Sequence, residues 1–77
     1  MVRIILVDDH AVVRSGLRML LESKPGIEVV GDAADGDEAI RMALQIKPDL
    51  VLMDLSMPHG KDGLTATAEL KKLLPDT

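Results

Sequence analysis

Short apolar runs alternate along the chain with stretches in which apolar residues recur every three or four positions. The runs lie at residues 2–7, 27–30 and 50–53, and the first is nearly continuous, as is typical of a strand buried on both faces of a parallel sheet. Helical spacing follows each run and predicts helices over about residues 10–23, 35–47 and 64–74. The pattern therefore predicts three consecutive strand–helix units.

Each predicted helix has one apolar face that we expect to be buried. The residues of these faces are Val13, Leu17, Leu20 and Leu21 in the first helix, Ala39, Ile40, Ala43 and Leu44 in the second, and Leu70, Leu73 and Leu74 in the third. Asp35, with Glu38 three residues later, resembles a capping box at the start of the second helix. A proline follows each helix and marks where it ends.

This order of strands and helices is typical of the α/β class, in which right-handed crossovers give a parallel sheet with helices on its faces. Three parallel strands leave an edge of the sheet unpaired. The last residues, Pro75 to Thr77, resemble the approach to a further strand. We therefore expect either a chain that continues beyond Thr77 or association through the open edge.

The composition allows one small folded domain. Of the 77 residues, 47% are apolar and 29% are charged, but none is Phe, Tyr or Trp, so the core must come from aliphatic residues and methionine. The absence of cysteine excludes a disulfide framework and favours an intracellular setting, and no apolar run reaches the roughly 18 residues of a membrane span. The net charge of −4 disfavours direct nucleic-acid binding by this segment.

Three aspartates directly follow two of the apolar runs. Asp8 and Asp9 come after the first run and Asp54 after the third, so all three are expected at the carboxyl ends of parallel strands, where α/β sheets bind ligands. If the strand order is 2-1-3, these strands are neighbours about 4.8 Å apart and the carboxylates converge. Converging carboxylates repel one another unless a cation lies among them, and oxygen ligands favour Mg²⁺. The sequence thus predicts a magnesium site that faces a phosphoryl group.

Asp54 is the best candidate for a phosphoryl acceptor, since it stands alone while Asp8 and Asp9 form a pair. A carboxylate can accept a phosphoryl group as an acyl phosphate when a metal neutralises the incoming oxygens. The alternative is structural: Asp8 and Asp9 would cap the first helix and Asp54 would form a turn. We expect His10 to open the first helix rather than hold the metal, because Mg²⁺ prefers oxygen.

Several motifs together resemble the receiver domain of two-component response regulators. They are residues 4–10 with Asp-Asp-His, residues 35–39, residues 48–58 around Asp54, and the pair Asp62-Gly63. The Asp-Asp-His motif, the Gly-Asp-Ala-Ala-Asp-Gly stretch from Gly31 and the Asp-Leu-Ser-Met-Pro stretch from Asp54 are similar to regulators of the NarL/LuxR (FixJ) type. The resemblance implies a flavodoxin-like (CheY-like) doubly wound parallel sheet of which the first three βα units are present.

The resemblance also implies a role for each motif residue. Asp54 would be phosphorylated by the phosphohistidine of a sensor histidine kinase, Asp9 would ligate Mg²⁺ directly, Asp8 would act mainly through water, and the backbone carbonyl of Ser56 would complete the protein ligands. Residues 1–77 would be the N-terminal part of a cytoplasmic receiver domain that is not an enzyme. The rest of the receiver and a C-terminal helix-turn-helix, which binds promoter DNA as a dimer, are expected beyond residue 77.

Two features depart from the family pattern. Three residues, His59 to Lys61, separate Pro58 from Asp62, one more than the usual spacing, and we expect this insertion to be neutral. The hydroxyl residue of the family's fourth strand and the lysine of its fifth, which bind and sense the phosphoryl group, would lie beyond residue 77. The 77 residues are therefore expected to accept phosphate slowly and not to transmit the signal as an intact receiver does.

Two other functions remain as alternatives. An aspartate-nucleophile phosphatase also places an acid at a strand end with Mg²⁺, but it carries a second acid two residues later, where this chain has Ser56. A non-phosphorylated interaction or dimerisation module of the same fold has no need to hold three mutually repelling carboxylates together. Neither a P-loop nor a Gly-x-Gly-x-x-Gly motif occurs, which argues against nucleotide binding.

Overall fold

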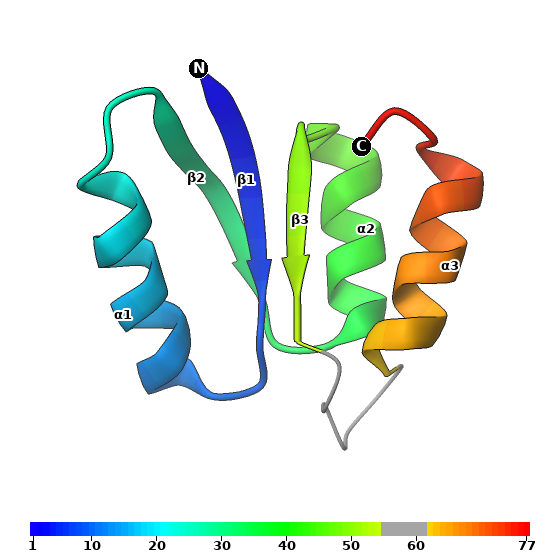
Figure 1. Ribbon diagram of the computed structural model, residues 1–77. Helices are drawn as coiled ribbons and strands as arrows, with labels where there is room; N and C mark the ends of the chain where they lie inside the picture. The colour runs from blue at the N-terminus through cyan, green and yellow to red at the C-terminus, as the bar shows by residue number, and fades with distance from the viewer. Residues whose placement is uncertain (55–61) are drawn as a thin grey trace.

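The computed structural model describes residues 1–54 and 62–77, in which three strands and three helices alternate (Figure 1). In chain order they are β1 (Val2–Val7), α1 (Ala11–Glu22), β2 (Ile27–Ala33), α2 (Gly36–Ile46), β3 (Leu50–Met53) and α3 (Gly63–Leu73). The predicted alternation of strands and helices is confirmed. None of the described helices is long and apolar enough to cross a membrane.

The described strands form a parallel sheet in the order β2-β1-β3, so β1 is central, as the convergence of the aspartates requires. Ile5 and Val7 of β1 face the core shared with α2 and α3, whereas Ile4 and Leu6 pack with Val29 on the face covered by α1 (Figure 1). These four β1 residues are at most 3% exposed. The prediction that the first strand is buried on both faces is confirmed.

The second strand extends three residues beyond its predicted end, from Val30 to Ala33. Glycine and aspartate are depleted in strands, so Gly31 and Asp32 gave no strand signal, yet they pair with Ile5 and Leu6 of β1. The register shifts at Val30, which has no partner in it. A β-carbon at Gly31 would lie 2.6 Å from the sulfur of Met42, so the glycine lets α2 pack closely against β2.

Aspartate side chains cap the N-termini of two of the described helices. Asp35 accepts a 2.8 Å hydrogen bond from the amide of Glu38, which confirms the predicted N-cap of α2. Asp62 accepts one from the amide of Thr65 at the start of α3, and this bond lowers the pKa of Asp62.

Because the folded chain lowers the pKa of Asp62, this cap contributes to the free energy of unfolding at pH values above the ordinary aspartate pKa. The contribution is lost as the pH falls through the lowered pKa.

The apolar face predicted for α1 is mostly exposed, and in this respect the prediction was wrong. Val13 is 45% exposed, Leu17 37% and Leu20 58%, while Leu21 packs against the cluster of Ile4, Leu6 and Val29. Helical spacing shows that a helix has an apolar face but not what covers it. Among the described residues, α1 contacts β1 and β2, and these contacts leave most of its predicted stripe uncovered.

The faces predicted for the other two helices are largely buried. Ala39, Ile40, Ala43 and Leu70 are at most 9% exposed, and Leu74 is half-buried against the same core. Leu44 and Leu73 were also predicted to be buried, but they are 43% and 50% exposed because they lie at the margins of these faces. The core on this side of the sheet therefore consists of small and branched aliphatic side chains.

Candidate functional site

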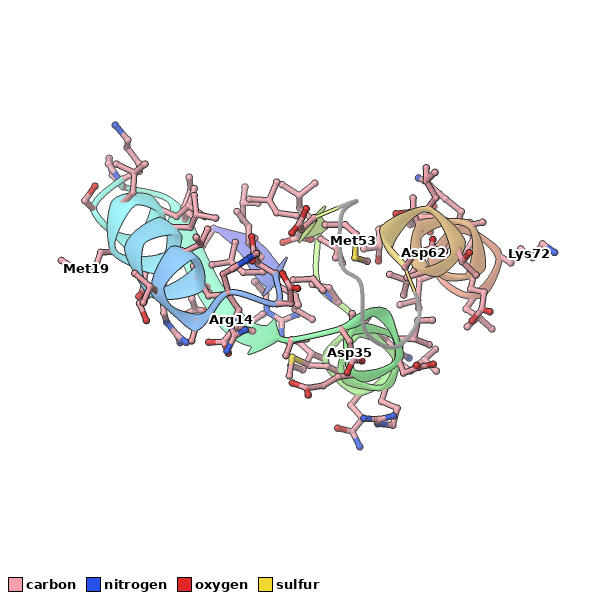
Figure 2. The ribbon with its side chains drawn as sticks, turned by 90° about the horizontal axis from the view of Figure 1, so that it is seen from below. Arg14, Met19, Asp35, Met53, Asp62 and Lys72 are labelled. Carbon is pink, nitrogen blue, oxygen red and sulfur yellow. The ribbon has the colours of Figure 1, made fainter. Side chains whose placement is uncertain are left out.

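The carboxyl ends of β1 and β3 lie side by side, and Figure 2 looks onto this edge of the sheet. The last residues of the two strands, Val7 and Met53, are partners in the ladder. The amide of Asp54 continues it with a 2.9 Å hydrogen bond to the carbonyl of Val7. Residues that follow these strands are therefore brought together, although more than forty positions separate them in the sequence.

Three carboxylates and one imidazole meet at this edge. One ligand atom from each of Asp8, Asp9, His10 and Asp54 lies within 4.8 Å of the other three. The side chains of Asp8 and Asp9 are only 14% and 16% exposed, so water screens their charges poorly. Carboxylates this close repel one another, and a bound cation would turn that repulsion into attraction.

Asp9 gives the most specific sign of a cation site. Its Oδ1 is buried and forms no hydrogen bond with any residue that the structure describes, whereas buried polar atoms normally have a partner. The Nδ1 of His10 lies 2.9 Å from this oxygen without a hydrogen bond between them, and it lies 3.2 Å from Oδ1 of Asp8. A buried carboxylate oxygen that accepts no hydrogen bond, beside an imidazole and two further acids, fits a hard cation such as Mg²⁺.

His10 is placed as the sequence predicted, at the start of α1. It is the N-cap residue of that helix, its side chain is 69% exposed, and its amide donates a 2.7 Å hydrogen bond to Oδ1 of Asp8. Asp8 thus forms part of the turn into α1, but it does not cap the helix as the structural alternative proposed, since the N-cap residue is His10 and no side chain caps this helix. A place in this turn is compatible with metal binding by Asp8, because a carboxylate has several lone pairs.

Behind the aspartates lies a set of charged residues that the sequence did not single out. Arg14 donates from Nη1 to the backbone carbonyl of Asp8, 2.5 Å away, and its Nε lies 3.6 Å from Oδ1 of Asp32. Arg18 forms a 2.8 Å ion pair with Oδ2 of the same aspartate. Their only signal in the sequence was the four-residue spacing, which places both arginines on one side of α1.

Part of the predicted site falls on residues 55–61, outside the described residues. Ser56, the Met57-Pro58 pair that ends the Asp-Leu-Ser-Met-Pro stretch, and the insertion from His59 to Lys61 belong to this segment. The described chain resumes at Asp62, and the buried Gly63 is the first residue of α3, one residue before the predicted start.

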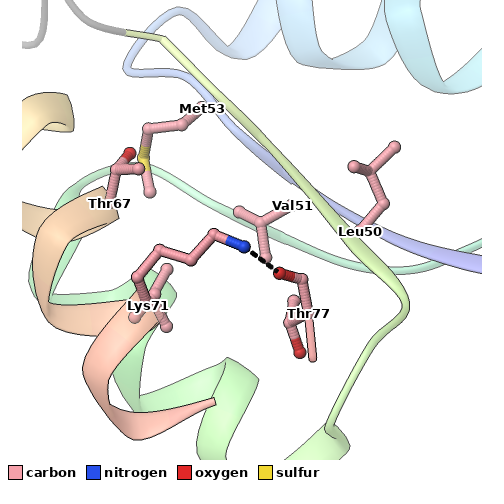
Figure 3. A pocket seen from close by; sticks show the side chains of 7 residues that line it. Leu50, Val51, Met53, Thr67, Lys71 and Thr77 are labelled. Carbon is pink, nitrogen blue, oxygen red and sulfur yellow. Dashed lines mark hydrogen bonds between the residues drawn. The ribbon is translucent and has the colours of Figure 1, made fainter. Parts of the chain in front are cut away.

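Two hollows lie beside β3, and one of them coincides with the acidic site. The first is an apolar groove between β3 and α3, where Lys71 donates a 3.2 Å hydrogen bond to the carbonyl of Thr77 (Figure 3). None of the described residues that line this groove is acidic. The second hollow reaches Asp8 and Asp54, with Leu17 and Leu52 among its lining. The second hollow, with its charged groups, is therefore the candidate binding site.

Comparison with known proteins gives a consistent result. Residues 4–77 match the family model described as the response regulator receiver domain. The chain is 49% identical over 76 residues to the transcriptional regulatory protein LiaR of Bacillus subtilis, covering 99% of this chain and 36% of LiaR. It is 48% identical over 75 residues to the oxygen regulatory protein NreC of Staphylococcus haemolyticus, covering 97% of this chain and 35% of NreC. The chain thus spans about a third of the length of these relatives.

Solved structures give the same picture. A LuxR-family response regulator from Aurantimonas has a TM-score of 0.89 and 46% identity, covering 95% of this chain and 51% of that one. The receiver domain of the response regulator NarL from Mycobacterium tuberculosis has a TM-score of 0.89 and 36% identity, covering 96% and 60%. RcsB from Salmonella enterica, bound to promoter rprA in the presence of the phosphomimetic BeF₃⁻, has a TM-score of 0.88 and 32% identity, covering 99% and 39%. The CheY-like fold with three βα units is confirmed.

Proposed function

This chain belongs to the response regulator receiver domain family, in its NarL/LuxR type, and on that basis we propose that Asp54 accepts a phosphoryl group from the phosphohistidine of a sensor histidine kinase. The observation that carries the proposal is the convergence of Asp8, Asp9 and Asp54 within 4.8 Å at the ends of two neighbouring strands. Two acids can then hold a cation while the third reacts.

The residues present fit a magnesium site. Asp9 would bind the ion directly through its buried oxygen, Asp8 mainly through water, and Asp54 would complete the carboxylate ligands. The family resemblance adds the backbone carbonyl of Ser56 as a further ligand. When bound, Mg²⁺ would neutralise the charge on the incoming phosphoryl oxygens.

The proposed reaction is a single phosphoryl transfer. A carboxylate oxygen of Asp54 forms a bond to phosphorus, and the bond between phosphorus and the donor's imidazole nitrogen breaks. That nitrogen leaves with the electron pair and takes a proton from water. The product is an acyl phosphate on Asp54 and a free histidine on the kinase, so the chain accepts the group without turning over a substrate.

We propose that this segment is the N-terminal part of a longer regulator. Its relatives LiaR and NreC are regulatory proteins about three times as long, and RcsB is similar to this chain in a promoter-bound structure with BeF₃⁻. The remainder of the receiver and a C-terminal helix-turn-helix would then bind promoter DNA. The acidic segment itself, with its net charge of −4, would not contact the DNA. The expected setting is the cytoplasm, where sensor kinases present their phosphohistidine.

Transfer from a small donor tests the proposal. We expect the chain, incubated with acetyl phosphate and Mg²⁺, to gain about 80 Da, one phosphoryl group, in its intact mass. Because the metal provides several kcal/mol of charge stabilisation, chelation of Mg²⁺ should slow the gain by at least about a hundredfold. If the mass increases at the same rate with and without chelator, the result argues against the metal site. If the mass does not increase at all, the result favours the non-phosphorylated interaction module.

The exposed edge of β3 supports a second proposal, the alternative to a continuing receiver: the 77-residue chain by itself associates through this edge. In the described parts of the chain β3 pairs with β1 alone, and Leu50 and Leu52 of this edge strand are 42% and 38% exposed. Unpaired apolar strands are templates for pairing with another chain. We expect sedimentation velocity to show association that grows with concentration and that Leu52→Lys weakens. A monomer at all concentrations would contradict this proposal.

A further inference from the structure

The side chain of Arg14 lies behind the pair of aspartates, between α1 and the end of β2 (Figure 2). Its Nη1 donates to the backbone carbonyl of Asp8 at 2.5 Å, and its Nε lies 3.6 Å from Oδ1 of Asp32. The side chain is only 19% exposed, so the guanidinium is largely removed from water. An arginine held from two directions can fix the turn that joins β1 to α1.

The carbonyl that Arg14 holds belongs to the peptide group between Asp8 and Asp9. Because a peptide group is planar, a bond to its oxygen also sets the direction in which Asp9 leaves the turn. The amide of Asp8 is fixed independently by a 3.1 Å hydrogen bond to the carbonyl of Ala33. Ala33 and Arg14 therefore hold the two sides of Asp8, and the Arg14 bond orients the peptide that carries the Asp9 carboxylate.

We propose that Arg14 is a positioning residue for the divalent-cation site, a role that rests on the proposed function. It acts through the peptide group between the two aspartates and is not itself a ligand. Partners that orient metal ligands typically change metal affinity about 10- to 100-fold when they are replaced. Loss of the Arg14 guanidinium should therefore weaken divalent-cation binding by about that factor.

The charge of Arg14 predicts the opposite change. A guanidinium beside the aspartates repels an incoming cation, so its removal would by itself strengthen cation binding. A weaker affinity after removal of Arg14 can therefore not come from the lost charge. The sign of the change distinguishes positioning from electrostatics.

Arg18 provides the matched control. It lies one helical turn further along α1 and pairs with the same Asp32, at 2.8 Å, but its other hydrogen bonds go to Glu22 and the carbonyl of Val29. Replacing Arg18 removes the same charge from the same partner and leaves the bond to the Asp8 carbonyl in place. We expect Arg18→Met to bind cations as tightly as the unchanged chain or more tightly.

Binding of Mn²⁺ to the 77-residue chain, followed by the loss of the free-ion electron paramagnetic resonance signal, measures this directly. The variants are Arg14→Met, Arg14→Lys, Arg18→Met and Asp9→Asn, each checked for helical circular dichroism and its urea midpoint. Mn²⁺ serves as the probe because the chain has no aromatic residue to report on binding. Lysine keeps the charge and one donor, so Arg14→Lys should fall between the unchanged chain and Arg14→Met.

The two proposals fail in different ways. If the unchanged chain and Asp9→Asn bind Mn²⁺ equally, the metal site itself is wrong. If Asp9→Asn loses binding while Arg14→Met binds as tightly as Arg18→Met, the metal site stands and the positioning role is overturned. If Arg14→Met does not fold, the comparison of Arg14→Lys with Arg18→Met decides, and equal affinities overturn the role. A merely structural role would lower the urea midpoint and leave the affinity of the folded chain unchanged.

Discussion

Replacing Asp54 with asparagine should abolish phosphoryl incorporation from acetyl phosphate, with no mass gain above that of a sample without donor. The amide has the shape of the carboxylate but is not a nucleophile for phosphorus at neutral pH, so the acceptor is lost while the side-chain shape at the end of β3 is kept. Intact-mass spectrometry of the chain with donor and Mg²⁺ makes the measurement. The effect is all-or-none because the proposed chemistry uses one acceptor.

The matched control is an exposed aspartate elsewhere in the same chain. Asp76 lies near the end of the chain, in the turn after α3, and Asp76→Asn should gain about 80 Da, one phosphoryl group, like the unchanged chain. Circular dichroism of both variants should match that of the unchanged chain, which separates loss of the acceptor from loss of the fold. Incorporation that persists in Asp54→Asn would place the reactive group elsewhere.

Replacing Ile5 with alanine should unfold a large fraction of the chain. Ile5 is 0% exposed, lies in the central strand and contacts the core of α2 and α3. Truncating such a residue costs about 2 to 5 kcal/mol. A domain of 77 residues has a total stability of about 4 to 12 kcal/mol. A core without aromatic side chains places this chain at the lower end of that range, so little stability would remain. Urea denaturation followed by circular dichroism measures the loss.

Val12→Ala is the control for this prediction. Val12 is also β-branched, but it lies on α1 and is 85% exposed. Its replacement should change the free energy of unfolding by no more than about 0.5 kcal/mol. A midpoint for Ile5→Ala equal to that of Val12→Ala would contradict the packing of β1 described above.

The strands were predictable from the sequence where burial alone determines them. The nearly continuous apolar run of β1 is typical of a strand that is buried on both faces, and the structure places Ile4 and Ile5 on opposite faces of the sheet. The end of β2 was not predictable in this way. Gly31 and Asp32 have poor strand propensity, and pairing with β1 keeps them in the sheet. The apolar periodicity of the sequence gives no information about this pairing.

For the helices too, the sequence pattern predicted the element but not all of its neighbours. The spacing of Val13, Leu17 and Leu20 correctly indicated an apolar face on α1, but burial depends on neighbours that the described sheet does not provide. In α2 the same kind of spacing predicted burial correctly for Ala39 and Ala43, because β1, β2 and α3 surround that helix.

Some residues of the candidate site were predictable from the sequence and others were not, for a similar reason. Asp8, Asp9 and Asp54 were predictable because strand ends in a parallel sheet share one edge, and residues that follow neighbouring strands must meet. Arg14 was not, since its partner is a backbone carbonyl six residues earlier, and carbonyls carry no signal in a sequence. Side-chain types thus located the reacting groups, and only the backbone geometry located the residue that orients them.

The central claim is that Asp54 carries the phosphoryl group, and chemical mapping of the acyl phosphate tests it most directly. Borohydride reduces an acyl phosphate to the alcohol, so a phosphorylated aspartate becomes homoserine while other aspartates remain unchanged. After treatment with acetyl phosphate and Mg²⁺, reduction and fragment mass spectrometry, we expect homoserine at position 54 and aspartate at positions 8 and 9. Homoserine at position 8 or 9, or at no position in a chain that has gained the phosphoryl mass, would contradict the assignment of Asp54 as the acceptor.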